Sequence, residues 1–331
     1  MAAPLALSDA RTDYRSVLRR LAAQQPAGAA GVEGESLERS VMASEPARLV
    51  KAIPLEGSTL RAHQVEGDPE VGFDAFLDGT QSSRALDYVD GVAVVHGTAA
   101  AVIRARRNRR MTTWGTPLVV SAIYAPQRAL PPRYWEGLHA LGVEVVDTSP
   151  APGDSLHPFS LRDAAVHRVQ KDRERLEQQL AERWCASERG RLFIDGGISG
   201  SERVAVSACT VGVVKSHRSL YAEGEELARV FALRRGERSS VVRITSSKRT
   251  TVASWYLRLR DPAGHDPMWG LVRVEVAEPA SAAELAAIGA RADEISRYVL
   301  AEAAPVALPD ARWHNMAYGI RDCEEFLRAI L

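Results

Sequence analysis

The chain has 331 residues, 46% of them apolar and 25% charged, which is typical of a soluble globular protein with a large buried core. Its 42 basic and 42 acidic residues cancel, so overall charge does not point to a nucleic-acid partner, although a local basic groove remains compatible with one. The N-terminus lacks a signal-peptide pattern and no apolar stretch reaches about 18 residues, so we expect a cytoplasmic protein without a membrane span.

The first 65 residues are predicted to form an N-terminal helical extension. Apolar residues recur at helical spacing within residues 1–25, at Tyr14, Val17, Leu18 and Leu21. The Ala- and Gly-rich residues 27–34 read as a break, and a second short helix is expected around 36–50.

Residues 66–331 are predicted to form one α/β domain with a mixed sheet flanked by helices. Apolar strand patterns occur at 73–77, 89–95, 98–103, 117–124, 143–146, 191–194, 204–214, 252–259 and 271–276. Helical patterns occur at 134–141, 161–184, 225–233, 281–300 and 309–330. The mixed order of strands and helices favours an α/β fold over a sandwich or a helical bundle.

The three cysteines do not suggest a site. The number of cysteines is odd, and Cys185, Cys209 and Cys323 lie far apart in the sequence without forming a C-x-x-C pair. This pattern argues against a disulfide framework and against a structural zinc site.

Two segments of the chain look alike. AFLDGT (75–80) and LFIDGG (192–197) each read as a short buried strand that ends in Asp-Gly. The carboxyl ends of such strands open onto the crevice where α/β sheets bind ligands. One Asp-Gly is also a common turn, but two carboxylates aimed at one place repel each other unless a cation lies between them. Asp78 and Asp195 are therefore candidate ligands of Mg²⁺ or Mn²⁺, which prefer oxygen donors.

A third carboxylate would come from the long helix at 161–184. Its apolar stripe places Glu177 at the border of the buried face and Glu174 toward solvent. Helix geometry alone leaves open whether Glu177 belongs to a site or is one more charge of the run KDRERLEQQLAER.

The densest basic cluster is also ambiguous. It comprises Arg104, Arg106, Arg107, Arg109 and Arg110. The cluster is either the solvated tip of a hairpin or a surface that contacts phosphates.

Taken together, the motifs resemble the NurA family of nucleases over about residues 70–331. They are a first strand with Asp-Gly, a helix with "LE" before a second strand with Asp-Gly, then GVVKSHRS, and a C-terminal histidine in RWHNMAYGI. The resemblance implies an RNase H-like fold for residues 66–331. It also implies Mn²⁺-dependent (or Mg²⁺-dependent) cleavage of DNA, exo- or endonucleolytic, by a homodimer docked on a hexameric HerA-type ATPase. The setting would be DNA end processing or phage defence.

The family's functional residues carry over onto matching positions. Asp78 and Asp195 match the two metal aspartates, Glu177 the helix glutamate and His314 the C-terminal histidine, while Lys215 lies in a segment that runs past the site. Two features depart from the pattern. The spacing between Glu177 and Asp195 is close to the family's but not shown to be identical, so Glu174 is kept as the alternative third carboxylate. In addition, Trp313 precedes His314 where the family commonly has alanine.

In this hypothesis Asp78, Glu177 and Asp195 hold one or two metal ions around the scissile phosphate. Lys215 or His314 stabilises developing charge or assists proton transfer. The arginines of 104–110, together with Arg249, contact the DNA backbone without reading bases.

Two other functions remain open from sequence. The segments FLDGTQSS and FIDGGISGS could be the phosphate loops of an actin-like or sugar-kinase-like ATPase. Alternatively, the protein could be a non-catalytic RNase H-fold subunit that docks on an ATPase or binds DNA. ATP hydrolysis without DNA would favour the first, and metal-independent DNA binding without cleavage the second.

Overall fold

The computed structural model describes residues 48–50, 52–246, 249–303 and 316–331. Within these residues, twelve strands form one mixed sheet that helices flank, which confirms the predicted α/β class. A two-stranded parallel pair, β1 (Arg48–Leu49) and β10 (Ser219–Leu220), lies beside the sheet. No helix of the described ranges is long and apolar enough to cross a membrane.

The sheet has its longest strands in one half. From one edge to the other its strands are β2 (Ile53–Pro54), β12 (Val242–Ser246), β13 (Arg249–Arg258), β14 (Leu271–Ala277), β9 (Thr210–Val214), β8 (Leu192–Asp195), β4 (Ala75–Val89), β5 (Val92–Arg107), β6 (Arg110–Ala125) and β7 (Val145–Asp147). A side branch pairs β13 with β11 (Glu237–Ser239) and β11 with β3 (Ala62–Gln64). The helices are α3 (Pro132–Ala140), α4 (Pro158–Ser187), α5 (Glu202–Ala205), α6 (Gly224–Phe231), α7 (Ala282–Ala286), α8 (Ile288–Glu302) and α9 (Tyr318–Ile330), with a 3-10 turn η2 (Gln127–Ala129).

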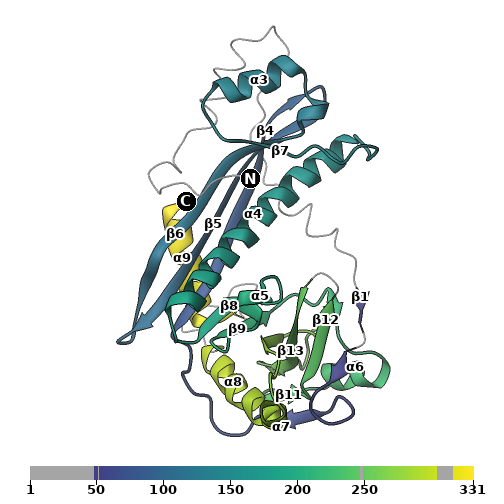
Figure 1. Ribbon diagram of the computed structural model, residues 1–331. Helices are drawn as coiled ribbons and strands as arrows, with labels where there is room; N and C mark the ends of the chain where they lie inside the picture. Colours follow the sequence, from purple (N-terminus) through teal and green to yellow (C-terminus); the bar gives the residue numbers. More distant parts are fainter. Residues whose placement is uncertain (1–47, 51, 247–248, 304–315) are drawn as a thin grey trace.

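Helices cover both faces of the sheet. Successive strand residues point to opposite faces, and apolar residues on both faces are buried against helices. Leu77 of β4 packs with the apolar stripe of α4, including Leu176. The preceding Phe76 points to the other face, where it packs with α8 and α9. Figure 1 shows α4 running along β4, β5 and β6, with α9 behind these strands. The buried core therefore has two layers, one on each side of the sheet.

Several predicted elements have other bounds in the structure. The strand predicted at 73–77 does not end at Asp78-Gly79, because β4 runs on to Val89 and pairs with β5 along this length. The segment predicted as one strand at 204–214 is a short helix, α5, followed by β9. Residues 48–49, placed in a helix by the prediction, form β1. Periodicity alone does not separate a short apolar helix from a buried strand.

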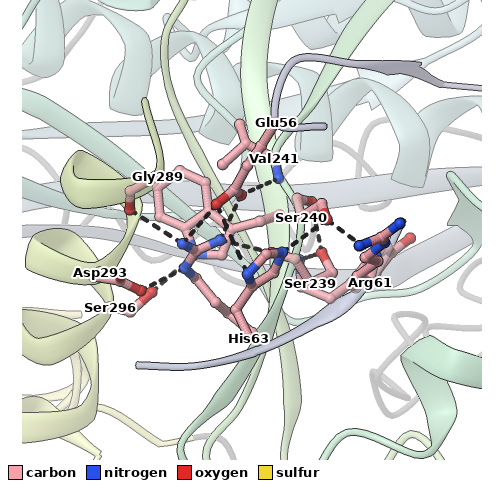
Figure 2. A network of polar contacts seen from close by, with 12 residues as sticks. Glu56, Arg61, His63, Ser239, Ser240, Val241, Gly289, Asp293 and Ser296 are labelled. Atoms are coloured by element: carbon pink, nitrogen blue, oxygen red, sulfur yellow. Dashed lines mark hydrogen bonds and ion pairs between the residues drawn. The ribbon is translucent and has the colours of Figure 1, made fainter. Parts of the chain in front are cut away.

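The predicted N-terminal extension lies mostly outside the described residues, and its boundary at residue 65 stays a prediction. Residues 53–64 belong to the sheet through β2 and β3. A buried ion-pair network fastens this segment to the rest (Figure 2). The Arg238 guanidinium donates to both carboxylate oxygens of Glu56, at 2.7 and 3.0 Å, and to Asp293 of α8 at 2.6 Å. One arginine thus joins the N-terminal segment, β11 and α8.

Candidate active site

Asp78 and Asp195 lie side by side in the centre of the sheet. The parallel strands β4 and β8 pair in the register Phe76 with Phe193 and Leu77 with Ile194. Continuing this register places Asp78 beside Asp195, on neighbouring strands that are about 4.8 Å apart. Both side chains point to the face of Phe76 and Phe193, which is the α9 face. The two aspartates predicted from the repeated Asp-Gly motif are brought together by the pairing of their strands.

Lys215 follows the end of the next strand, β9. Asp195 pairs with Val213 in the parallel register of β8 and β9, so Lys215, two residues further, lies on the same face. Its Nζ donates to Asp195 Oδ2 at 2.8 Å, and about a fifth of each side chain is exposed. The structure therefore places a cation directly against one of the paired carboxylates.

Glu177 reaches the site from the opposite face, across a glycine. It projects from α4, and a Cβ placed on Gly79 would lie 2.3 Å from Glu177 Oε1 and 3.0 Å from the Ala100 carbonyl oxygen. The absence of a side chain at Gly79 lets α4 bring Glu177 close to Asp78. Glu174, the reserve candidate, is exposed and accepts a hydrogen bond from Gln170 at 2.9 Å. Helix geometry predicted this difference between the two glutamates.

Three further charged side chains at the site were missed by sequence reasoning. A pocket of 290 Å³ is lined by Asp78, Gly79, Thr80, Arg173, Asp195, Glu324 and Arg328. Arg173 of α4 pairs with Glu177 at 2.5 Å, and Arg328 of α9 pairs with Glu324 at 3.5 Å. Each helix thus supplies one arginine and one glutamate, four residues apart, from opposite faces of the sheet. The i, i+4 spacing was readable in the sequence, but many surface helices carry such pairs.

A second, larger pocket adjoins the first and shares Arg173 and Asp195 with it. Its volume is 410 Å³, and Glu177 and Arg249 are among its lining residues. The turn after Asp195 forms part of its wall and is held by Glu275 of β14, whose Oε2 accepts from the Ile198 N–H at 2.9 Å. Of the predicted DNA-contacting arginines, Arg249 therefore lies beside the carboxylates.

Several carboxyl groups lie close together at the site, and their burial makes it unfavourable for all of them to be ionised. Burial, together with the charges of Asp195, Glu177 and Glu324, raises the pKa of Asp78 well above its usual range, while Lys215 opposes this. Burial also raises the pKa of Glu177 to about 7, although Arg173 lowers it. Carboxyl groups with such pKa values hold protons at a pH where exposed carboxylates do not, and a bound cation would displace them.

The stability of the metal-free protein should fall as pH rises through this range. Glu177 has an ordinary pKa of 4.5 and a folded-state pKa of about 7, so its proton favours folding below pH 4.5 and this contribution is lost as pH rises through 7. In EDTA, Glu177→Gln should therefore gain in melting temperature over the wild type between pH 5 and 7.5. Scanning calorimetry measures both curves. A difference that stays constant with pH would contradict the raised pKa.

The donor set fits a hard divalent cation. Among the described residues, no group of three or more His, Cys, Asp or Glu side chains converges tightly enough to hold a metal ion by itself. Mg²⁺ does not require one, since it is usually held by one or two carboxylates, waters and the phosphate of a substrate. The paired Asp78 and Asp195 supply these carboxylates, and Glu177 adjoins them. His314, the remaining candidate, lies outside the described residues.

The five arginines of residues 104–110 separate into two groups. Arg104 pairs with Asp322 of α9 at 2.5 Å, and Arg106 forms a two-pronged pair with Glu302 of α8 at 2.7 and 2.8 Å. These guanidinium groups hold helices against the sheet. Arg107, Arg109 and Arg110 are exposed at the β5–β6 turn, where Asn108 and Arg109 adopt positive φ angles of 50° and 63°. Only this second group is open to a phosphate backbone.

The comparisons with known proteins are sparse. No protein-family profile and no curated protein matches the chain. Among solved structures, it is similar to the crystal structure of the NurA nuclease from Sulfolobus solfataricus, with 10% sequence identity and a TM-score of 0.44 over 84% of this chain and 81% of that one. At these values the likeness establishes neither family membership nor activity. An assignment of function therefore depends on the chemistry of the site.

Proposed function

We propose that this protein is a nuclease that hydrolyses phosphodiester bonds of DNA with the help of Mn²⁺ or Mg²⁺. The observation that carries the proposal is the pairing of Asp78 with Asp195 on adjacent strands, with Glu177 and Lys215 against them. Buried like charges of this kind destabilise a fold unless a cation compensates them, and their presence supports the proposal that the site binds one.

The chain's own residues divide the work between them. Asp78 and Asp195, with Glu177 adjoining them, would hold the metal, which would supply Lewis-acid activation of water and stabilise charge on the phosphate. Lys215, already 2.8 Å from Asp195, is placed to stabilise negative charge that develops on a phosphate oxygen at this position. His314 remains a candidate for proton transfer.

Two arginines are placed to orient the phosphate. Arg173 and Arg328 line the pocket that holds Asp78 and Asp195, and they come from helices on opposite faces of the sheet. A guanidinium group suits the bidentate recognition of phosphate oxygens. We therefore assign Arg173 and Arg328 to positioning of the scissile phosphodiester, and Arg249 to contact with the neighbouring phosphates of the DNA backbone.

The order of motifs that resembles NurA supports DNA as the substrate. A homodimer docked on a HerA-type hexameric ATPase, in DNA repair or antiviral defence, belongs to the same proposal.

A cleavage assay tests this function. End-labelled single- and double-stranded DNA would be incubated with Mn²⁺, Mg²⁺ or EDTA and with the wild type, Asp78→Asn or Asp195→Asn. Asp90→Asn is a matched control, because Asp90 also precedes a glycine but lies exposed at the β4–β5 turn. We expect metal-dependent cleavage by the wild type and the control alone. Normal cleavage by both site variants would overturn the assignment, and metal-independent DNA binding without cleavage, even with a HerA-type ATPase present, would indicate a docking subunit.

Metal binding gives a readout that does not depend on cleavage. Because Asp78 and Glu177 have raised pKa values, binding of Mn²⁺ at pH 7 should release roughly one proton or more. Calorimetric titrations in buffers of different ionisation enthalpy would measure this release. Asp78→Asn should weaken binding and reduce the number of protons released, and Asp90→Asn should do neither.

Gly79→Ala should inactivate the enzyme without removing any catalytic group. The new Cβ would displace Glu177, and a displacement of about 1 Å can lower a rate roughly 100-fold. We expect a loss of at least that size in the rate of DNA cleavage, together with a lower melting temperature. Adding Glu177→Asp, which shortens the displaced side chain, should restore part of the melting temperature but not the rate, because the contact with the Ala100 carbonyl oxygen remains. A Gly79→Ala variant with wild-type rate and stability would show that Glu177 does not pack as described.

The exposed arginines at the β5–β6 turn should contribute to DNA affinity. Arg107 and Arg110 are direct cross-strand partners, an arrangement of like charges that weakens a hairpin unless an anion lies between them. Replacing Arg107, Arg109 and Arg110 with glutamine should make DNA binding less dependent on salt. The slope of the logarithm of the binding constant against the logarithm of the salt concentration should decrease by about 1 for each arginine that contacts a phosphate. Fluorescence anisotropy at several salt concentrations measures this slope. The matched control replaces three other exposed arginines, Arg48, Arg133 and Arg183. An equal change in the salt dependence of the control would indicate that the effect comes from net charge and not from a DNA contact at the β5–β6 turn.

A further inference from the structure

Two cysteines that are far apart in the sequence meet in the fold. Cys185 lies in the last turn of α4, and Cys209 lies just before β9. Both side chains are half-buried and pack against the same core layer, and each thiol perturbs the pKa of the other. The backbone on each side is fixed, because the Cys209 carbonyl accepts from Leu192 N–H at 2.8 Å and the α4 C-terminus is closed by Glu188 N–H to Trp184 O at 2.8 Å.

The surroundings make the two sulfurs chemically different. The hydrogen bond from Cys185 lowers the pKa of Cys209 to about 6, with help from Ser207 and Arg189. The Ser207 hydroxyl lies 3.0 Å from Cys209 Sγ. The same hydrogen bond, together with burial, raises the pKa of Cys185. Cys209 is thus the more acidic thiol of the pair, and the Ser207 hydroxyl beside it favours Cys209 as the nucleophile.

We propose that Cys185 and Cys209 form a thiol pair that low-molecular-weight disulfides oxidise reversibly to an intramolecular disulfide. The proposal does not depend on the nuclease function. It rests on the packing of both side chains against the same core layer, on their partial exposure and on the hydroxyl of Ser207 beside Cys209. Cys323 does not share these features, because it is fully buried and its thiol donates to the Phe76 carbonyl oxygen.

The reaction balances with a small disulfide as the oxidant. The Cys209 thiolate attacks one sulfur of the small disulfide, whose S–S bond breaks and releases one thiolate with the bonding electrons. Cys185 then loses its proton to solvent and attacks Cys209 Sγ in the mixed disulfide, which releases the second thiolate. Two protein thiols are oxidised by two electrons, and the small disulfide is reduced to two thiols. In a reducing cytosol the same steps run in reverse.

The product would tie the end of α4 to the start of β9. Glu177 lies on α4 and Lys215 directly follows β9, and the two side chains approach the paired aspartates from opposite faces of the sheet. Oxidation would therefore fix the relative position of two elements that frame the candidate site.

Oxidation of the native full-length protein by graded oxidised glutathione tests the proposal. Samples would be quenched with an alkylating agent and mapped by mass spectrometry. We expect a Cys185–Cys209 disulfide in the wild type, Cys323 remaining a thiol, and reversal by reduced glutathione. Two free thiols after full exposure, or a disulfide that involves Cys323, would overturn the proposal.

Variants separate the roles of the two sulfurs. Cys185→Ser should stop at the mixed disulfide with one glutathione on Cys209, because no resolving thiol is present. Cys209→Ser should react at least about tenfold more slowly, since a protonated thiol is a poor nucleophile. In the unmodified wild type, alkylation at pH 7 should favour Cys209 over Cys185 by a similar factor, which checks the order of reactivity without any substitution. Equal reactivity of the two cysteines would contradict the assignment.

Discussion

Replacing Arg238 with methionine is expected to lower the free energy of unfolding by about 3–5 kcal/mol, the usual effect of removing one partner from a buried ion pair. The Arg238 side chain is only 2% exposed and is held by Glu56 and Asp293. Methionine fills a similar volume but leaves both carboxylates facing a buried position without a counter-charge. The residues of the network come from three parts of the chain, so the segment after β2, the strand β11 and the helix α8 lose their common anchor. Urea unfolding followed by circular dichroism measures the change.

Two further variants show whether charge or packing causes this loss. Arg321→Met removes an arginine from the more exposed pair with Glu325, and should change stability by less than about 1 kcal/mol. Adding Glu56→Gln and Asp293→Asn to Arg238→Met removes the unpaired charges and should recover part of the loss. If the triple variant were no more stable than the single one, lost packing and hydrogen bonds, rather than unpaired charge, would explain the effect.

The second large effect is expected at Asp78, where activity and stability should change in opposite directions. Asp78→Asn keeps the shape of the side chain and the acceptor for the Gly79 N–H, but removes a buried carboxyl group whose ionisation beside Asp195 and Glu177 is unfavourable. In the absence of metal the variant should be more stable than the wild type by about 1–3 kcal/mol at neutral pH, the scale of an uncompensated buried polar group. DNA cleavage should be abolished, because the paired carboxylates no longer both bind the cation.

Adding metal should make the wild type more stable than Asp78→Asn, the reverse of the order expected in EDTA. A cation that binds the folded state stabilises it by about 2.7 kcal/mol when its concentration is 100 times the dissociation constant. Wild-type protein should therefore gain melting temperature in Mn²⁺, whereas Asp78→Asn should gain little. Thermal unfolding of both proteins in EDTA and in Mn²⁺ measures all four values. An Asp78→Asn variant that is less stable than the wild type in EDTA would indicate that the aspartate has a structural role instead.

The sequence was informative where a residue's place depends on local pattern. An apolar run before Asp-Gly was enough to locate Asp78 and Asp195 on buried strands, and the parallel register then sets them side by side. The helical angle between Glu177 and the apolar stripe of α4 correctly predicted that Glu177 is less exposed than Glu174, although both line the larger pocket. The bounds of β4 were predicted less well, because Asp-Gly is typical of turns and only the pairing with β5 extends the strand through it.

Other parts of the site depend on contacts between distant segments. Glu324 and Arg328 lie among the charged residues of an amphipathic helix, and only the packing of α9 on Phe76 brings them to the pocket. The separation of Arg104 and Arg106 from the exposed arginines depends on partners more than 190 residues away along the chain. Cys185 and Cys209 likewise meet only after β8 and β9 pair. No local spacing encodes such contacts.

The topology of the sheet also has a consequence for the order in which the nascent chain folds. The meander of β4, β5 and β6 pairs neighbouring segments and can form as soon as it leaves the ribosome, because short loops close quickly. The strands β2 and β3, synthesised earlier, find their partners only in β12 and β11, between 173 and 190 residues later. We therefore expect residues 53–64 to stay unpaired through most of translation and to be the last strands added at their edge of the sheet. During that interval their unpaired backbone is exposed to other chains, and chaperones that bind extended segments would protect it.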